Sequence, residues 1–254
     1  MEPLPYLKKI ELKRNLIDSF DAYPFSIPAI KSLHEIEFGK NVTILVGENG
    51  SGKSTLLEAV AVGLGFNAEG GTKNFNFATR SSHSALFQYL KFSKSYKKYQ
   101  DGFFLRAESF YNLASNIDEL DEQYIPVGVT APRIRGSYGG KSLHQQSHGE
   151  SFLSLMLDRF SGQGLYLLDE PEAALSPSRQ LTILSRMHQL VNQQSQFIIA
   201  THSPILMAYP NAKIYQIDQT GISPIDYRET EHYQITKAFL NNPEPMLNTL
   251  FVDD

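Results

Sequence analysis

The chain has 254 residues, a length that suits one large α/β domain or a domain with a sizeable insertion. Its formal net charge of −4 means that the chain as a whole does not attract nucleic acid or anionic lipid, although a local basic patch is compatible with that balance. The absence of cysteine excludes disulfides, zinc–thiolate sites and thiol catalysis. No run approaches the roughly 18 apolar residues of a membrane span, and the start lacks the apolar stretch of a signal peptide. We therefore expect a soluble, cytoplasmic protein without direct membrane insertion.

The first part of the chain predicts strands that lead into a glycine-rich turn. Alternating apolar residues predict early strands at 7–17 and 34–38. Residues 42–46 form a largely apolar, mostly β-branched run, which is typical of a buried parallel strand, and residues 54–64 have helical composition. The next segments predict a loop at 66–82, a helix at 84–99, a strand at 102–107, an acidic helix at 115–124, a long loop at 125–149 and a helix at 151–160.

The last part predicts an alternation of strands and helices. In chain order we expect a strand at 165–168, a helix at 177–192, strands at 197–200 and 212–218, and a closing helix at 230–240. Such alternation favours an α/β fold with a mostly parallel core sheet. Three polar clusters follow the ends of predicted buried strands, where open α/β sheets bind ligands.

The first of these clusters, between a predicted strand and a predicted helix, matches the pattern GxxxxGK[ST] in full. Its glycines let backbone N–H groups turn toward phosphate oxygens, and the helix N-terminus adds the positive end of its dipole. Lys53 is expected to reach the β- and γ-phosphates and Ser54 to ligate Mg²⁺. A chance glycine-rich turn is the ordinary alternative. We predict that ATP and Mg²⁺ are bound here by Gly47, Asn49, Gly50, Ser51, Gly52, Lys53, Ser54 and Thr55.

Two further clusters supply acid–base groups. Asp169 and Glu170 end a buried strand, where Asp169 is placed to hold Mg²⁺ and Glu170 to act as general base on the attacking water. His202 follows the next strand and is placed to hydrogen-bond the γ-phosphate or that water. The ordinary alternatives are a solvated strand end and a surface histidine. We predict Glu170, His202 and Lys53 as the catalytic residues.

A fourth segment opens a helix after the long loop. Ser147 and Glu150 have the spacing of a capping box, and the same helix start is a site for an anion. The two interpretations are compatible. The anion need not be the nucleotide of the same subunit.

Taken in chain order, the four motifs resemble those of the ABC-type ATPase superfamily: the phosphate loop, the segment at Ser147–Glu150, the acidic strand end and then His202. The resemblance implies an ABC-type P-loop NTPase fold with a mostly parallel core sheet, an antiparallel N-terminal β region and a helical insertion. It also implies a head-to-tail homodimer in which Ser147, Gly149 and Glu150 contact the partner's nucleotide. We expect a single domain over residues 1–254, with a core at 1–65 and 161–254 and a helical signature subdomain at about 66–160.

Within that superfamily, the sequence is most similar to the soluble SMC/RecF/OLD-like branch. The resemblance rests on Asp169-Glu170-Pro171-Glu172 and on Thr201-His202-Ser203-Pro204. The chain departs from the family pattern at His148, where glycine is usual, and at Gln146, where leucine is usual. The glutamine that usually follows this strand in the family is not evident after 102–107, and Glu108 is our candidate for the metal-proximal position there.

Candidate contacts with other molecules are less specific. Lys91, Lys94 and Lys98, with Tyr96 and Tyr99 nearby, would share a face of the helix expected at 84–99, which is either a DNA-contacting stripe or a solvated helix face. A second basic set in the long loop would contact nucleotide, the partner subunit or DNA: Arg133, Arg135 and Lys141. Tyr23 and Phe25 are candidates for stacking on adenine, with core packing as the alternative.

Three hypotheses for function follow. The first is an ATP-driven dimer that binds and hydrolyses ATP and acts on DNA or on a partner protein, in repair or phage defence. The second is the ATP-binding subunit of an ABC transporter. The third is a regulatory nucleotide switch with little turnover. The residue patterns at 169–172 and 201–204 favour the first hypothesis over the second.

Overall fold

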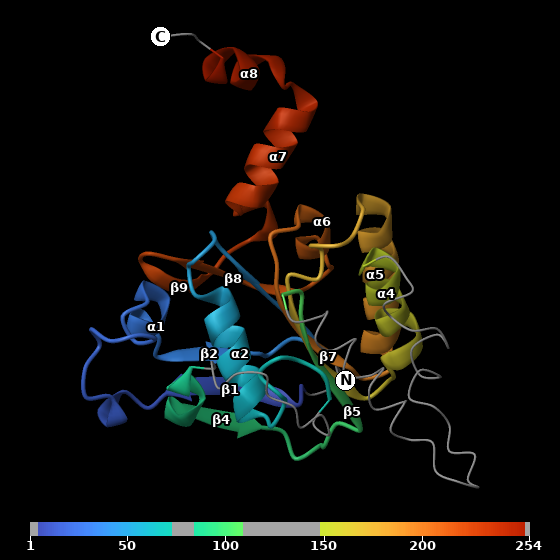
Figure 1. The fold of residues 1–254 in the computed structure, drawn as a ribbon. Helices are drawn as coiled ribbons and strands as arrows, with labels where there is room; N and C mark the ends of the chain where they lie inside the picture. Colours follow the sequence, from blue (N-terminus) through green and yellow to red (C-terminus); the bar gives the residue numbers. More distant parts are fainter. Residues whose placement is uncertain (1–4, 73–83, 109–147, 252–254) are drawn as a thin grey trace, which may run out of the picture.

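The computed structural model describes residues 5–72, 84–108 and 148–251, which form two β-sheets with helices between and around them (Figure 1). The helix expected at 115–124 and nearly all of the long loop expected at 125–149 lie outside the described residues. In the described part of the chain, no helix is both long enough and apolar enough to cross a membrane.

The main sheet is mostly parallel, as predicted. Its six strands lie in the order β5-β6-β7-β3-β8-β9, and only β9 is antiparallel to its neighbour. Every residue of β3, β6 and β7 is buried, which explains their nearly continuous apolar sequences. The strands are β3 (Val42–Val46), β5 (Asp101–Arg106), β6 (Gly164–Asp169), β7 (Gln196–Ala200), β8 (Lys213–Asp218) and β9 (Gly221–Pro224).

A second, antiparallel sheet is built from the N-terminal region and one later strand. It has the order β2-β1-β4, with β1 at Leu7–Leu12, β2 at Glu35–Glu37 and β4 at Leu90–Lys94. The expected first strand is shorter than predicted, because a 3₁₀ turn, η1 (Arg14–Leu16), follows it.

The prediction of a helix at 84–99 is wrong. A 3₁₀ turn, η2 (Ala85–Tyr89), leads into β4, which pairs with β1 through Ile10 opposite Phe92. The apolar residues Leu90 and Phe92 alternate along β4. This period of two suits a strand, but the partner that makes it one lies about 80 residues away, so local spacing misleads.

Helix α2 (Lys53–Gly63) lies between the two sheets. Its buried residues Leu56, Leu57 and Val60 belong to one hydrophobic cluster with Leu7 of β1 and Ile198 of β7. On the other face of the main sheet, a second cluster joins that sheet to α4 (His148–Ser154), to a π-helical turn, η5 (Leu155–Arg159), and to α5 (Pro177–Asn192). The layers fix the start of α2 against the main sheet (Figure 1).

The remaining helices are short or peripheral. They are α1 (Pro28–Ser32), α6 (Pro204–Met207), η6 (Tyr227–Glu229), α7 (Glu231–Asn241) and α8 (Glu244–Leu250). Helices α7 and α8 extend away from the sheets (Figure 1). The pattern predicted α7 but not α8, which begins only two residues after α7 ends.

The structure bears in one respect on the expected division of the chain into a core and a helical subdomain at about 66–160. Strands β4 and β5 fall inside the range of the expected helical subdomain, yet they belong to the two sheets. Most of the remaining range, 109–147, lies outside the described residues. A separate subdomain there stays a prediction.

Candidate functional site

The strand order brings the three predicted polar clusters to one edge of the main sheet. Strands β6, β7 and β3 are consecutive neighbours and run parallel, so the residues that follow each of them emerge side by side. These residues are Gly47 after β3, Glu170 after β6 and Thr201 after β7. Parallel pairing therefore assembles groups as far apart in sequence as Gly47 and Thr201.

The phosphate loop needs glycine at two of its turns. Gly47 has φ of 152°, and a Cβ there would lie 2.1 Å from the carbonyl oxygen of Ile217. Gly52 has φ of 102° and caps the N-terminus of α2. Side chains rarely adopt these angles, so glycine at these positions is required by the backbone path.

A cavity of about 320 Å³ lies over this loop. It is lined by Tyr23, Ile27, Asn49, Gly50, Gly52, Lys53, Ser54, Thr55 and Glu170. Gly47 and Ser51 do not line it. Of the two adenine candidates, Tyr23 reaches the cavity and is 67% exposed, whereas Phe25 packs edge-on against Phe20 and Tyr89.

Lys53 is buried at the base of this cavity. Its Nζ donates hydrogen bonds to the carbonyl oxygens of Gly47, at 2.9 Å, and Glu48, at 2.8 Å. Burial lowers the pKa of the ammonium, and the carboxylates of Glu170, Asp169 and Glu172 act in the opposite direction. The ammonium thus sits where an anionic ligand would restore its charge balance.

Ser54 and Asp169 form an oxygen pair beside the loop. The Ser54 hydroxyl donates to Asp169 Oδ1 at 3.0 Å, and the Asp169 side chain is 7% exposed. Burial raises the pKa of Asp169 to about 6, and nearby Glu170 and Glu108 act in the same direction, while Ser54 and Arg106 oppose it. Hydroxyl and carboxylate oxygens are the donors that Mg²⁺ prefers.

The described residues contain no cluster of three or more histidine or acidic side chains that would cage a metal ion. Mg²⁺ bound to a nucleotide keeps several waters and takes only one or two protein ligands. The pair of Ser54 and Asp169 fits that demand.

Glu170 and His202 face each other above the pair. Glu170 has a left-handed backbone (φ of 50°), which is uncommon outside glycine, and its N–H donates to the carbonyl of Ala200 at 2.9 Å. His202 Nε2 lies 3.6 Å from Glu170 Oε1. The His202 N–H donates to the buried carboxylate of Glu172 at 2.6 Å, which fixes the chain after β7.

A second histidine, which the sequence did not single out, completes this group. His232 on α7 places its Nε2 3.0 Å from His202 Nδ1. Burial is the main cause of a lowered pKa for both rings, and the charge of Lys53 adds to it. The residues lie 30 positions apart in different elements, so no local signal could have found the pair.

The position beside Asp169 is taken by Arg106, which pairs in register with it across β5 and β6. Its guanidinium contacts Glu58 of α2 at 2.6 Å, and its Nε lies 3.9 Å from Asp169 Oδ2. The predicted metal ligand Glu108 is 84% exposed at its side chain and lies 3.3 Å from Arg106 Nη2. No hydrogen bond or ion pair joins Glu108 to Ser54 or Asp169, so its role as a ligand stays a prediction.

The described residues of the expected signature segment lie outside the phosphate-loop cavity. Ser147 is outside the described residues, and α4 begins at His148. Gly149 is buried, and a Cβ there would lie 2.5 Å from the carbonyl oxygen of Ala174. Glu150 is exposed and lies 3.7 Å from Arg179. Neither Gly149 nor Glu150 lines the phosphate-loop cavity of its own chain.

Two family models match the sequence. One, described as an AAA domain, matches residues 20–123, and the other, described as an AAA domain with putative AbiEii toxin, Type IV TA system, matches residues 134–208. Together with the phosphate loop and the mostly parallel sheet, these matches are consistent with an AAA/ABC-type P-loop ATPase domain. They are also consistent with the ABC-type ATPase superfamily.

Two curated proteins share parts of this sequence. An uncharacterized ABC transporter ATP-binding protein of Haemophilus influenzae is 35% identical over 77 residues, which is 30% of this chain and 29% of that protein. The ABC transporter G family member STR2 of Medicago truncatula is 26% identical over 177 residues, which is 64% of this chain and 24% of that protein. The matches therefore span less than a third of these curated relatives.

Solved structures with a similar arrangement include an SMC head domain from Thermotoga maritima, with a TM-score of 0.44, 17% identity and coverage of 87% of this chain and 99% of that one. Another is the dimeric bacterial ABC transporter cassette MJ0796, with a TM-score of 0.49, 13% identity and coverage of 91% and 100%. Likeness at this level does not indicate activity or partners.

Proposed function

We propose that this protein binds ATP with Mg²⁺ over Gly47–Thr55 and hydrolyses it as a head-to-tail homodimer that drives a DNA-related or partner-protein process. One observation carries the proposal. A single cavity edge gathers a buried ammonium, an oxygen pair suited to Mg²⁺ and a carboxylate beside a histidine. These are the groups that phosphoryl transfer to water requires.

Each group has a distinct task in the proposed reaction. Lys53 binds the β- and γ-phosphates, and Ser54 and Asp169 hold Mg²⁺, which supplies positive charge against the phosphate oxygens. Glu170 lines the cavity and accepts a proton from the attacking water. The water oxygen bonds to the γ-phosphorus as the bond to the ADP oxygen breaks, and His202 hydrogen-bonds the transferring group.

The dimer explains why the signature segment lies away from the cavity. Gly149 and Glu150 do not line the phosphate-loop cavity of their own chain. In the proposed arrangement these residues, with Ser147, contact the γ-phosphate held by the other subunit. Closure around two nucleotides then depends on ATP, and hydrolysis reopens the pair.

The variant Glu170→Gln tests the mechanism and the dimer together. Glutamine keeps the size of the side chain but cannot accept the proton, so we expect turnover to fall by about 10² or more while ATP remains bound. Size-exclusion chromatography with ATP and Mg²⁺ should show the variant as a dimer. The matched control is Glu229→Gln, an exposed glutamate on η6, which should keep normal turnover. A Glu170→Gln chain that stays monomeric with bound ATP would remove the dimer.

The names of the curated relatives favour a second candidate, the ATP-binding subunit of a transporter. Purification from native cells distinguishes the two. Recovery in the membrane fraction with a hydrophobic permease would support the transporter. Recovery with nucleic acid or with a partner that is not a membrane protein would support the first proposal. ATP affinity without phosphate release would instead indicate a regulatory switch.

A further inference from the structure

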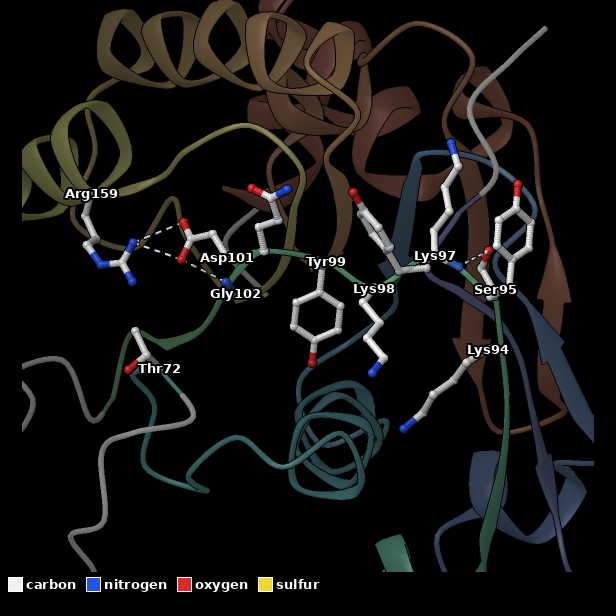
Figure 2. Close-up of a pocket in the computed structure, with 12 residues that line it drawn as sticks. Thr72, Lys94, Ser95, Lys97, Lys98, Tyr99, Asp101, Gly102 and Arg159 are labelled. Carbon is white, nitrogen blue, oxygen red and sulfur yellow. Dashed lines mark hydrogen bonds and ion pairs between the residues drawn. The ribbon is translucent and has the colours of Figure 1, made fainter.

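A second hollow lies at the opposite edge of the main sheet from the phosphate loop. It has a volume of about 600 Å³ and is formed largely by the loop between β4 and β5 (Figure 2). β5 starts at this edge with Asp101 and ends beside Asp169. Six strand residues therefore separate the two sites, roughly 20 Å.

The fold holds this loop in place at both ends. The Ser95 N–H donates to the carbonyl of Tyr6 at 2.8 Å, and the Gln100 N–H donates to that of Gln163 at 2.9 Å. The Tyr99 ring packs edge-on against Tyr6, with centroids 5.7 Å apart. The loop crosses from one sheet to the other, and the hollow lies along it.

Three lysines in this hollow lack acidic partners. No described carboxylate lies within ion-pair distance of Lys94, Lys97 or Lys98, whereas Lys91, on the same strand as Lys94, lies 2.8 Å from Glu11. The one acid of the hollow, Asp101, is paired with Arg159 at 2.9 Å. A chain with a net charge of −4 thus concentrates uncompensated positive charge in one place.

The hollow also presents aromatic surface. Tyr96 is 81% exposed, the largest exposed fraction among the large apolar side chains of the described residues. In Figure 2, Lys94 and Lys98 extend to the same side of the loop as the Tyr99 ring, while Lys97 extends to the other side. Cations beside exposed aromatic rings are typical of surfaces that bind nucleic-acid single strands, because phosphates contact the cations and bases stack on the rings.

We propose that this hollow binds a single strand of nucleic acid, with backbone phosphates on Lys94 and Lys98 and a base on Tyr96. A duplex keeps its bases inside the stack and cannot offer one to Tyr96 without unpairing. An acidic polypeptide would satisfy the lysines but leave the ring without a role. The inference names a partner for the proposed function, and it rests on that function. Its test measures DNA binding without ATP and therefore does not depend on ATP hydrolysis.

The test is fluorescence anisotropy of a labelled 20-nucleotide single-stranded DNA with the full chain and no ATP. Lys94→Ala with Lys98→Ala should weaken binding at least about tenfold and reduce the slope of log affinity against log salt by about 1.4, since each single-strand phosphate contact contributes about 0.7. Tyr96→Ala should weaken binding about tenfold with an unchanged salt slope. The control is Lys31→Ala with Lys91→Ala, which removes the same charge elsewhere and should bind like the parent chain.

Two outcomes would overturn the proposal. One is equal DNA binding, or none, in the parent chain and in the hollow variants. The other is competition by poly-glutamate as effective as that by unlabelled oligonucleotide, which would indicate charge alone. Lys53→Ala separates this proposal from the ATPase, because it should lose ATP but keep DNA. An unchanged far-UV circular dichroism spectrum in every hollow variant confirms that each chain is folded.

Discussion

The pair of His202 and His232 is the contact that links the proposed active site to the C-terminal helices. The two ring nitrogens lie 3.0 Å apart, so one ring donates and the other accepts when both are neutral. If His232 donates, His202 keeps its proton on Nε2, the nitrogen that faces Glu170. His232 is then a positioning residue that selects the tautomer of His202 and anchors α7 to the site.

This pair predicts a dependence of stability on pH. Both pKa values are lowered in the folded chain, mainly by burial, so the unfolded chain binds protons first as pH falls. Stability from the neutral pair is complete above the unfolded pKa of about 6.5 and is lost as pH falls below it. Thermal unfolding between pH 8 and pH 5.5 should therefore shift less in His232→Leu than in the parent chain.

Other groups titrate in the same range, so the comparison needs a matched histidine. Asp169 has a raised pKa of about 6 and changes stability in the opposite direction, but it does so in both chains. His188→Leu removes an exposed histidine on α5 and should shift like the parent chain. An equal pH shift in the parent chain and both variants would contradict the account of the pair.

At the scale of elements, one side chain joins three pieces of secondary structure. Arg106 at the end of β5 contacts Glu58 of α2 at 2.6 Å and faces Asp169 of β6. The side chains of Arg106 and Glu58 are 19% and 11% exposed, so this ion pair is largely shielded from water. Removal of one partner leaves an uncompensated charge between the helix and the sheet.

We expect Arg106→Ala to lower the free energy of unfolding by about 3 kcal/mol, as for other buried pairs that lose one partner. Urea denaturation measures the change. The exposed pair of Lys91 and Glu11 is the control, and Lys91→Ala should cost less than about 1 kcal/mol. Equal losses in the two variants would show that burial gives the Arg106 pair no special weight.

Elements with strong local patterns could be predicted from sequence. The strand at 42–46 and the helix at 177–192 have the predicted bounds, because a continuous apolar run and a proline-started amphipathic stretch each carry their own signal. The structure of residues 84–99 could not be predicted in this way, because β4 is stabilised by its pairing with the distant strand β1. The three lysines placed on one helix face therefore lie on β4 and on the loop after it, where Lys94 and Lys98 still line one hollow.

Some residues of the candidate site could likewise be predicted from the sequence, and others could not. The groups at strand ends were predictable because parallel strands bring their carboxyl ends to one edge. Arg106 and His232 were not assigned roles, since each acts through a partner in another element. Glu108 is a metal-ligand candidate by resemblance to the family, its carboxylate lies 3.3 Å from Arg106, and its role stays a prediction.

At the scale of the whole molecule, two candidate sites lie at opposite edges of the main sheet. One edge carries the phosphate loop and the proposed catalytic groups, and the other carries the hollow with its lysines and tyrosines. Helices α7 and α8 extend from the side of the phosphate loop (Figure 1), with Leu240, Leu250 and Phe251 each more than 70% exposed. The proposed ATP-dependent closure at one edge can thus be studied apart from the proposed DNA binding at the other.

The central claim is that the loop at Gly47–Thr55 binds ATP. Isothermal titration of the purified chain with ATP and Mg²⁺ tests it most directly, with Lys53→Ala as the comparison. We expect saturable binding at one site per chain, and a loss of at least about tenfold in affinity when the ammonium is removed, because a charge-assisted hydrogen bond contributes about 1.5–3 kcal/mol. No heat of binding in the parent chain, or equal affinity in Lys53→Ala, would contradict the claim.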